Sequence, residues 1–390
     1  LDRQGNVIRD AMLWNDVSSA PQAAALIEKM GAAPAVDGEP EDPIARGKQR
    51  WVKAVGSSPV ASYTLTKVAW VAENEPENAK KIAAVCLPHD WLSWRIAGYG
   101  PVAEGEDAHL DALFTDRSDA SGTIYYDAAS GEYRRDLIAM VLEPAEGDQS
   151  AKAHADAIVL PTVLGPRDAA AVKASPAIAG GDVDGGCLIA PGGGDNAMAS
   201  LGLGMAVGDV SVSLGTSGVA AAISENPTYD LTGAVSGFAD CTGHYLPLAC
   251  TINGSRILDA GRAALGVDYD ELAKLAFASE PGAGGITLVP YFDGERTPNR
   301  PDATATLSGL TLANTTKENM ARAFVEGLLC SQRDCLELIR SLGAEIKRIL
   351  LIGGGAKSEA IRTLAPSIFG MDVTRPATDE YVAIGAARQA

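Results

Sequence analysis

The chain has 390 residues, of which 46% are hydrophobic and 21% are charged, so it is long enough for two domains that each bury a core. Its formal net charge of -18 repels the phosphates of nucleic acid and the surface of anionic membranes, and we expect neither as a partner. The acidic charge favours an enzyme that acts on small molecules. No apolar run approaches the roughly 20 residues that a membrane helix needs. Six scattered cysteines without metal-ligand spacing indicate reduced thiols in a cytoplasmic protein.

The first third of the sequence combines helical patterns with acidic loops. It begins at Leu1 with residues typical of the middle of a strand and turn, so we expect a fragment of a longer protein. Apolar residues at helical spacing predict helices over 21–30 and 61–73. Segments 36–43 and 102–107 are predicted loops, because they are rich in Gly and acidic residues.

From residue 187 onward, short apolar runs alternate with helices and glycine-rich turns, which is the pattern of α/β architecture. The runs predicted to be strands are 187–190, 210–214, 219–223, 286–289 and 349–352. The longest predicted helix covers 321–342 and has apolar residues at helical spacing, so we expect it in the core.

The first glycine-rich turn contains Asp195 and precedes a predicted helix over 197–205. Its G-x-G-x-x-A pattern imitates a dinucleotide-binding fingerprint, but it places a carboxylate where the pyrophosphate would lie. An unshielded carboxylate on such a turn suits a general base. It also suits a cap on the helix behind it, and these residues alone support the base and the cap equally.

The second turn joins two strand-like runs and contains Gly215, Thr216, Ser217 and Gly218. Strand, tight turn and strand predict a hairpin whose tip exposes amides and two hydroxyls. Such a tip can bind phosphate, although an ordinary hairpin turn remains an alternative.

The third turn follows the run 349–352, and its members are Gly353, Gly354, Gly355, Ala356, Lys357 and Ser358. A P-loop requires Gly immediately before the Lys, and Ala356 occupies that position. A helix predicted to begin near Lys357 and the small residues before it suit an adenosine or a phosphate. A plain strand-to-helix turn is the alternative.

Taken in order, these segments resemble the FGGY family of carbohydrate kinases. Residues 192–197 resemble its catalytic-base segment, residues 213–218 its second phosphate-binding hairpin, and residues 353–358 its adenosine-binding turn. Further segments similar to the family are 62–74, 305–310 with 319–326, and 380–387. Segments 13–16, 115–123 and 295–298 are more similar to its xylulokinase branch than to the glycerol kinases.

The resemblance implies an α/β fold of two actin-like, ribonuclease-H-like ATPase domains with a catalytic cleft between them. The domains implied are residues 1–208, which bind the sugar, and residues 209–390, which bind the nucleotide. It also implies that an N-terminal segment with a phosphate- and metal-binding hairpin, and a C-terminal helix, lie outside this chain. We therefore expect the metal ligands in that segment, and residues 1–390 alone to be inactive.

The implied activity is ATP-dependent phosphorylation of D-xylulose to D-xylulose 5-phosphate, with ATP and Mg²⁺ as cofactors and a homodimer as a possible assembly. Asp195 is implied as the general base, and Asn196 is implied to bind a sugar hydroxyl. The other implied sugar contacts are Trp14, Asn15 and Asp16. One alternative is a sugar kinase of the same family that acts on L-ribulose, gluconate or another ketose. Two alternatives belong to different classes. An actin-like ATPase module would turn over ATP independently of any sugar. A nicotinamide-dependent oxidoreductase would bind NAD.

Overall fold

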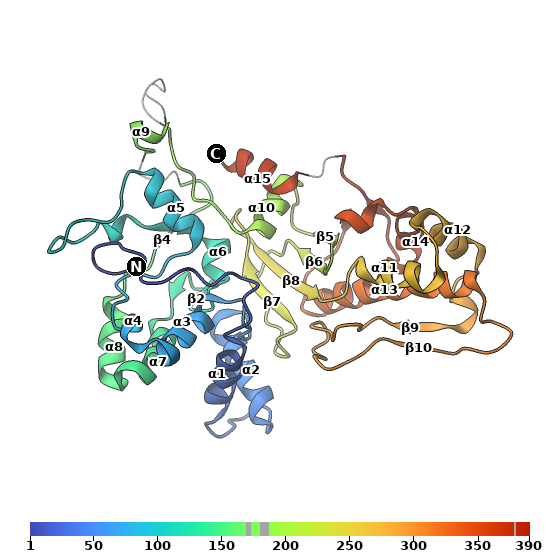
Figure 1. Ribbon diagram of the computed structural model, residues 1–390, viewed down its shortest axis with the longest axis horizontal. Helices are drawn as coiled ribbons and strands as arrows, with labels where there is room; N and C mark the ends of the chain where they lie inside the picture. The colour runs from blue at the N-terminus through green and yellow to red at the C-terminus, as the bar shows by residue number, and fades with distance from the viewer. Residues whose placement is uncertain (169–172, 180–186, 378–379) are drawn as a thin grey trace.

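The computed structural model describes residues 1–168, 173–179, 187–377 and 380–390. These residues form two lobes (Figure 1). One hydrophobic core consists of buried side chains between Leu26 and Leu160, and a second consists of buried side chains between Val210 and Phe369. The predicted α/β class and the presence of two domains are therefore confirmed.

The first lobe is mostly helical, and its strands pair only two at a time. Its helices are α1 (Ala20–Gly31), α2 (Pro43–Val55), α3 (Thr64–Asn74), α4 (Pro76–Ala79), α5 (Pro88–Ile96), η1 (Leu110–Ala112), α6 (Arg117–Ser121), α7 (Arg135–Glu146), α8 (Asp148–Ala157) and α9 (Pro176–Ala179). Its strands are β1 (Phe114–Asp116), β2 (Tyr126–Asp127), β3 (Glu132–Tyr133) and β4 (Thr162–Leu164). β1 pairs with β4 in parallel, and β2 pairs with β3 antiparallel.

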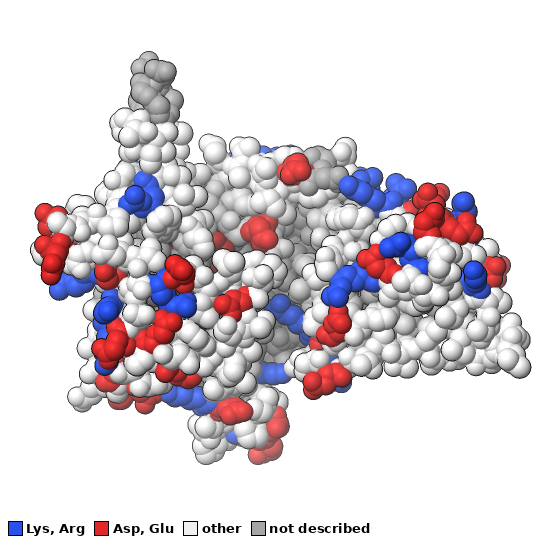
Figure 2. All heavy atoms as spheres, viewed as in Figure 1, with Lys and Arg blue, Asp and Glu red and all other residues white. Residues whose placement is uncertain are grey.

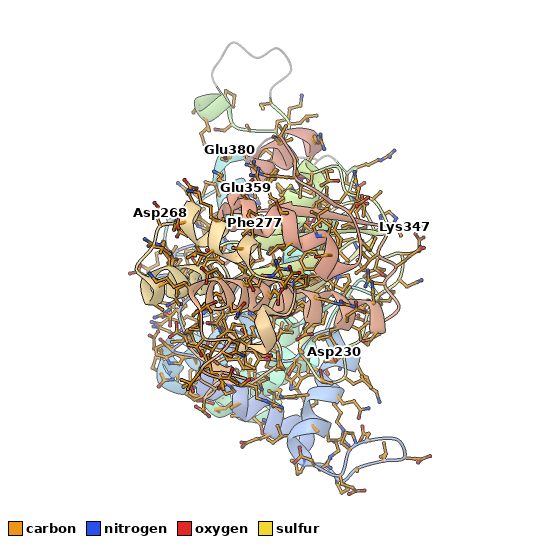
Figure 3. All side chains as sticks on the ribbon, turned by 90° about the vertical axis from the view of Figure 1, so that its right-hand side faces the viewer. Asp230, Asp268, Phe277, Lys347, Glu359 and Glu380 are labelled. Atoms are coloured by element: carbon orange, nitrogen blue, oxygen red, sulfur yellow. The ribbon has the colours of Figure 1, made fainter. Side chains whose placement is uncertain are left out.

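The second lobe is built on a six-stranded sheet with the order β12-β11-β5-β6-β8-β7. The strands are β5 (Asp209–Leu214), β6 (Gly218–Ala222), β7 (Val235–Ala239), β8 (Tyr245–Thr251), β11 (Arg348–Ile352) and β12 (Val373–Thr374), with β9 (Thr287–Val289) and β10 (Thr306–Ser308) as a separate pair. The helices are α10 (Asp195–Gly202), α11 (Arg256–Leu265), α12 (Tyr269–Ala278), η2 (Ala283–Gly285), α13 (Lys317–Ser341), η3 (Gly354–Lys357), α14 (Glu359–Phe369) and α15 (Tyr381–Gln389). In the side view, Phe277 on α12 and Glu359 on α14 mark two helices that pack together (Figure 3).

The two faces of the sheet carry different helices, because successive residues of a strand point to opposite sides. Ala220 and Ala222 of β6 belong to the core that contains α11 to α14. Ala221, on the same strand, belongs to a cluster with Ala197 and Met198 of α10. α10 therefore lies on the face of the sheet opposite α13.

α10 is also fixed against the last helix, α15, by glycines at the point of contact. A Cβ atom on Gly202 would lie 1.8 Å from the carbonyl oxygen of Tyr381. A Cβ atom on Gly385 would lie 1.9 Å from the carbonyl oxygen of Met198. Neither helix can come this close with any larger residue at these two positions.

The seam between the lobes runs along β7, the edge strand of the large sheet. The N–H group of Gly237 donates to the carbonyl oxygen of Gly56 at 2.9 Å, and the hydroxyls of Tyr63 and Ser236 lie 2.7 Å apart. The first of these contacts uses a backbone group on the free edge of β7, which would otherwise lack a partner. On the face shown in Figure 2, the molecule is hollowed between the lobes, and Lys and Arg side chains border the hollow.

Most predicted elements are present, with two differences. The strand predicted over 187–190 is wrong, because only Leu188 forms a single bridge, with Lys173, and no second strand among the described residues extends it. The helix predicted to begin near Lys357 is α14, which begins at Glu359 after the short turn η3. Over the part of the chain that the structure describes, no helix has both the length and the apolar character that crossing a membrane requires.

Candidate active site

The predicted base, Asp195, is the first residue of α10 and follows three glycines. Its side chain is exposed, and its Oδ1 atom accepts hydrogen bonds from the backbone N–H (2.8 Å) and the Nδ2 atom (3.1 Å) of Asn196. Gly194 is the N-cap, so Asp195 is not the capping residue that the sequence left as an alternative. Its Oδ2 atom has no hydrogen-bond donor among the described residues, which leaves this oxygen accessible to a ligand.

Two amides of the glycine turn are already bonded to side chains. The N–H group of Gly194 donates to Ser118 Oγ at 2.9 Å. The N–H group of Gly192 donates to Gln389 Oε1 at 3.0 Å, and Gln389 Nε2 donates back to the Gly192 carbonyl at 2.7 Å. These amides cannot also bind a phosphate, which argues against the dinucleotide-binding interpretation. The turn is thus held by α6 on one side and by α15 on the other.

A cluster of buried polar side chains lies behind this turn. Asp116, at the N-cap of α6, accepts hydrogen bonds from the backbone N–H (2.9 Å) and the hydroxyl (2.6 Å) of Ser118. His89 of α5 lies between two carboxylates, with Nδ1 2.6 Å from Asp119 Oδ2 and Nε2 2.7 Å from Asp90 Oδ1. Both contacts are ion pairs by distance, without the directionality of hydrogen bonds.

The environment of this cluster shifts the protonation of two of its members. Burial lowers the pKa of His89, but the contacts with Asp119 and Asp90 outweigh burial and raise that pKa to about 10. His89 is therefore a cation at neutral pH. Burial raises the pKa of Asp116 to about 6, although the hydrogen bonds from Ser118 and Asp119 oppose this shift.

The predicted phosphate hairpin is present. β5 ends at Leu214, β6 begins at Gly218, and these two residues are paired across the ladder. The carbonyl oxygens of Gly215 and Thr216 accept N–H groups from the two residues before α11, at 2.8 and 3.0 Å. The N–H groups of residues 215–217 have no acceptor within the described part of the chain. Adjacent amides without partners are typical of backbone loops that bind anions.

The third glycine-rich turn packs directly on the hairpin. Gly353 has a φ of +86°, and a Cβ atom there would lie 2.8 Å from the backbone of Leu214. A Cβ atom on Gly355 would lie 2.9 Å from Leu214 Cβ. In contrast, Gly354 is exposed, and a Cβ atom on it would meet no atom within 4 Å. Two of the three glycines are therefore required by packing, whereas Gly354 faces open space.

The hairpin and this turn occupy the same edge of the sheet. β5 and β11 are parallel and in register, with Ser213 opposite Ile352, so their carboxyl ends lie side by side. Ligands in α/β proteins bind at that edge. Beyond the glycines, Ala356 is buried, Lys357 is exposed, and Ser358 is the N-cap of α14. All the residues predicted to bind nucleotide are thus brought together.

The remaining predicted sugar contacts, residues 14–16, precede α1. Trp14 is 79% exposed, and Asn15 is exposed as well. The Asp16 carboxylate accepts the backbone N–H and the hydroxyl of Ser18, which lowers its pKa. No hydrogen bond or ion pair between described residues joins this segment to Asp195 or Asn196. Its role as a sugar contact remains a prediction.

No group of three or more His, Cys, Asp or Glu side chains among residues 1–168, 173–179, 187–377 and 380–390 is placed to hold a metal ion. Mg²⁺ in phosphoryl-transfer enzymes is often held by one or two carboxylates and the phosphates themselves, so such a cage is not required for it to accompany a nucleotide.

Sequence reasoning missed the residues that hold the base turn. His89 and Gln389 were not predicted to have a functional role, and Asp116, Ser118 and Asp119 were recognised only as part of a family-like segment. A histidine followed by an acidic residue at a helix start was the local signal available, in Leu87-Pro88-His89-Asp90. Nothing local indicated the long-range partner of each residue.

Comparison with known proteins also divides the chain into two parts, but it places α10 in the first part. Residues 41–202 match the family model for the N-terminal domain of the FGGY family of carbohydrate kinases. Residues 210–390 match the model for the C-terminal domain of the same family.

Several relatives match over the whole chain, including the following three. The crystal structure of xylulose kinase from Bifidobacterium adolescentis is 92% identical, superposes with a TM-score of 0.98, and is covered over 77% of its own length. The xylulose kinase of Streptomyces coelicolor is 39% identical over 399 residues, and that of Streptomyces rubiginosus is 39% identical over 393 residues. The chain spans 71% of the length of each of these two relatives.

Proposed function

This chain belongs to the FGGY family of carbohydrate kinases, and we propose that it catalyses ATP-dependent phosphorylation of D-xylulose to D-xylulose 5-phosphate, with Asp195 as general base. The choice of sugar rests on one observation, the 92% identity over the whole chain to a protein described as a xylulose kinase. The relatives at 39% identity carry the same description, whereas a gluconate kinase of the same fold is 19% identical.

Asp195 has the features that a base for an alcohol requires. A sugar hydroxyl is a poor nucleophile, and a carboxylate within hydrogen-bond reach can accept its proton as the oxygen attacks. Oδ1 of Asp195 is held by Asn196, so the carboxylate is oriented, and Oδ2 is the oxygen that accepts the proton. The Asn196 side chain is exposed next to it and is proposed to bind a neighbouring sugar hydroxyl.

The transfer itself requires positioning more than covalent chemistry. The sugar oxygen forms a bond to the γ-phosphorus while the bond from that phosphorus to the β–γ bridging oxygen breaks, and ADP leaves. Charge on the transferred group is stabilised by preorganised donors. We assign this role to the N–H groups of residues 215–217, which have no acceptor among the described residues, and to the hydroxyls of Thr216 and Ser217.

The nucleotide is proposed to lie on the turn 353–358. Because the space above Gly354 is open, the adenosine can approach the backbone there closely. Ser358, at the N-cap of α14, places a hydroxyl and a helix N-terminus beside it. Ala356 supports the turn from within the core, and Gly353 and Gly355 hold it against Leu214.

The ion and the domain roles are part of the same proposal. When bound with ATP, Mg²⁺ supplies positive charge to the phosphates. The described residues include no group of three or more ligand side chains placed to hold this ion, and no step above depends on Mg²⁺. We propose that residues 1–208 bind the sugar, with Trp14, Asn15 and Asp16 among its contacts, and that residues 209–390 bind the nucleotide.

The experiment that tests this function measures ADP release by the full-length enzyme across a panel of sugars. The panel contains D-xylulose, D-ribulose, L-ribulose, D-fructose, gluconate and glycerol. We expect the highest kcat/KM with D-xylulose. A higher kcat/KM with gluconate or glycerol would contradict the proposed substrate, and ADP release that is independent of any sugar would contradict the kinase itself.

A further inference from the structure

We propose that His89 is a positioning residue for the catalytic base: clamped between Asp90 and Asp119, it forms the support on which the Gly192–Gly194 turn rests and so fixes the place of Asp195. This inference rests on the proposed role of Asp195 and extends it to a residue that does not touch the substrate.

The turn needs such support because of its composition. Three consecutive glycines precede Asp195, and glycine restricts the backbone less than any other residue. A base must be held close to its productive geometry, since a displacement of about 1 Å can cost about 10²-fold in rate. The rigidity must therefore come from the groups that surround the turn.

His89 and Asp119 lie directly against the turn. A Cβ atom on Gly192 would lie 3.3 Å from the Cδ2 and Nε2 atoms of the His89 ring, and one on Gly194 would lie 3.1 Å from Asp119 Oδ1. Both glycines thus touch the His89–Asp119 pair with no side chain between them. A third contact, from Gly194 N–H to Ser118 Oγ, ties the residue before the base to the same helix, α6.

The charges around His89 explain why the support is rigid. Asp90 of α5 and Asp119 of α6 lie on opposite ring nitrogens, at 2.7 and 2.6 Å. Thr115 of β1 places its hydroxyl 3.4 Å from Nε2. One cation between two carboxylates joins α5 to α6 in a partly buried site, where such contacts are stronger than at the surface.

The Asp90 carboxylate is itself oriented by its own helix. Its Oδ2 atom accepts the N–H group of Leu87 at 2.7 Å, in the capping position of α5. Asp90 is 1% exposed, so its negative charge requires the histidine as a partner. Replacement of His89 by a neutral side chain would leave two carboxylates uncompensated beside the turn and allow the turn to move.

The test compares His89→Gln with a matched control, His154→Gln, in the full-length enzyme. His154 is also a partly buried histidine, 2.6 Å from the Glu146 carboxylate and 2.6 Å from the Ile82 carbonyl oxygen, but it lies on α8. We expect His89→Gln to lower kcat at least tenfold and to leave the KM for ATP within about twofold. The control should leave both constants unchanged.

Combination with Asp195→Asn separates positioning from general destabilisation. If His89 acts through Asp195, His89→Gln should change the residual rate of Asp195→Asn by less than threefold. An equal loss of kcat in both backgrounds, or an unchanged kcat in His89→Gln alone, would overturn the proposal. An unchanged kcat in Asp195→Asn alone would instead overturn the assignment of the base.

A second variant decides the matter if His89→Gln does not fold. Ser118→Ala removes only the acceptor of the Gly194 N–H group and one hydrogen bond to Asp116. We expect it to lower kcat about threefold to tenfold with an unchanged KM for ATP, and to have little effect in the Asp195→Asn background. The same loss in both backgrounds would contradict the role of this support.

Discussion

The turn that carries Asp195 and the turn at 353–355 are both runs of three glycines, yet the protein holds them in different ways. Polar side chains from distant elements hold the first: Ser118, Gln389 and the His89–Asp119 pair. The backbone of a neighbouring strand holds the second, because Gly353 and Gly355 lie directly on Leu214. In the first turn the absence of side chains on the glycines lets charged side chains lie close to the backbone. In the second turn it lets the backbone pack closely on Leu214.

This difference shows that three consecutive glycines can be held in place either by polar side chains or by steric contact with a neighbouring strand. A turn held by charge and hydrogen bonds should respond to pH and to loss of a polar partner. A turn held by steric contact should respond to added volume and should be insensitive to pH. The predictions below test that distinction, from the largest expected effect to the smallest.

The largest effect is expected at Asp195, the functional group that the first turn presents. Asp195→Asn keeps the shape of the side chain but removes the basic oxygen, so kcat should fall by about 10²–10⁴ while ATP binding is retained. Rapid quench or coupled ADP assays and nucleotide titration measure the two quantities. Asp148→Asn is the matched control, because Asp148 also begins a helix after a glycine N-cap. A kcat of Asp195→Asn within a few-fold of wild type would contradict the role of Asp195 as the general base.

At Gly353 the second turn should fail sterically. Gly353→Ala places a Cβ 2.8 Å from the Leu214 backbone at a φ of +86°. Strain at positive φ and overpacking together should lower the free energy of unfolding by roughly 3 kcal/mol. Gly354→Ala, one residue further, should change it by less than about 0.5 kcal/mol. Urea unfolding of both variants tests this contrast, and equal stabilities would show that the turn relaxes around the added methyl group.

The polar support of the first turn should be sensitive to pH. The pKa of His89 rises from 6.5 to about 10 in the folded protein, so between these values the folded chain keeps a proton that the unfolded chain loses. The stability from these contacts is complete below pH 6.5 and is lost as the pH rises towards 10. The full shift corresponds to roughly 5 kcal/mol, but the His89 side chain is partly exposed and water screens its contacts, so we expect a decrease on the order of 2 kcal/mol over that window.

The measurement compares urea unfolding of wild type and His89→Gln at several pH values. The difference in stability between them should be largest near pH 6 and should shrink towards pH 10. A difference that is constant over this range would mean that folding does not raise the pKa of His89.

The smallest effect is expected at Gly354, where the second turn faces open space. Gly354→Val should leave the fold intact, because a Cβ there meets no atom within 4 Å, but the larger side chain occupies the space proposed for adenosine. We expect the Kd for ATP to rise about tenfold, which corresponds to about 1.4 kcal/mol. Calorimetric titration measures it, with Gly354→Ala as the smaller step. Unchanged affinity in a folded Gly354→Val protein would place the adenosine elsewhere.

Local features of this chain were predictable, and long-range ones were not. The three turns follow from glycines beside apolar runs, and the helix α13 follows from its apolar spacing. The contact between Gly192 and Gln389 joins residues 197 positions apart, and no local pattern encodes such a pair. For the same reason the apolar run 187–190 was mistaken for a strand: Leu188 is 60% exposed and forms a single bridge, and no local pattern shows whether a partner strand lies beside a run.

The Asp195 turn is bonded to Ser118 from the first lobe and to Gln389 from the last helix, and the edge strand β7 joins the lobes nearby. In any rotation of two bodies about a seam, displacement grows in proportion to distance from the axis. α10, which carries Asp195, packs on the same sheet that carries the two nucleotide turns. A rotation of the first lobe about this seam would therefore leave the distance between the base and those turns unchanged, and it would alter only the distance from the base to groups held by the first lobe.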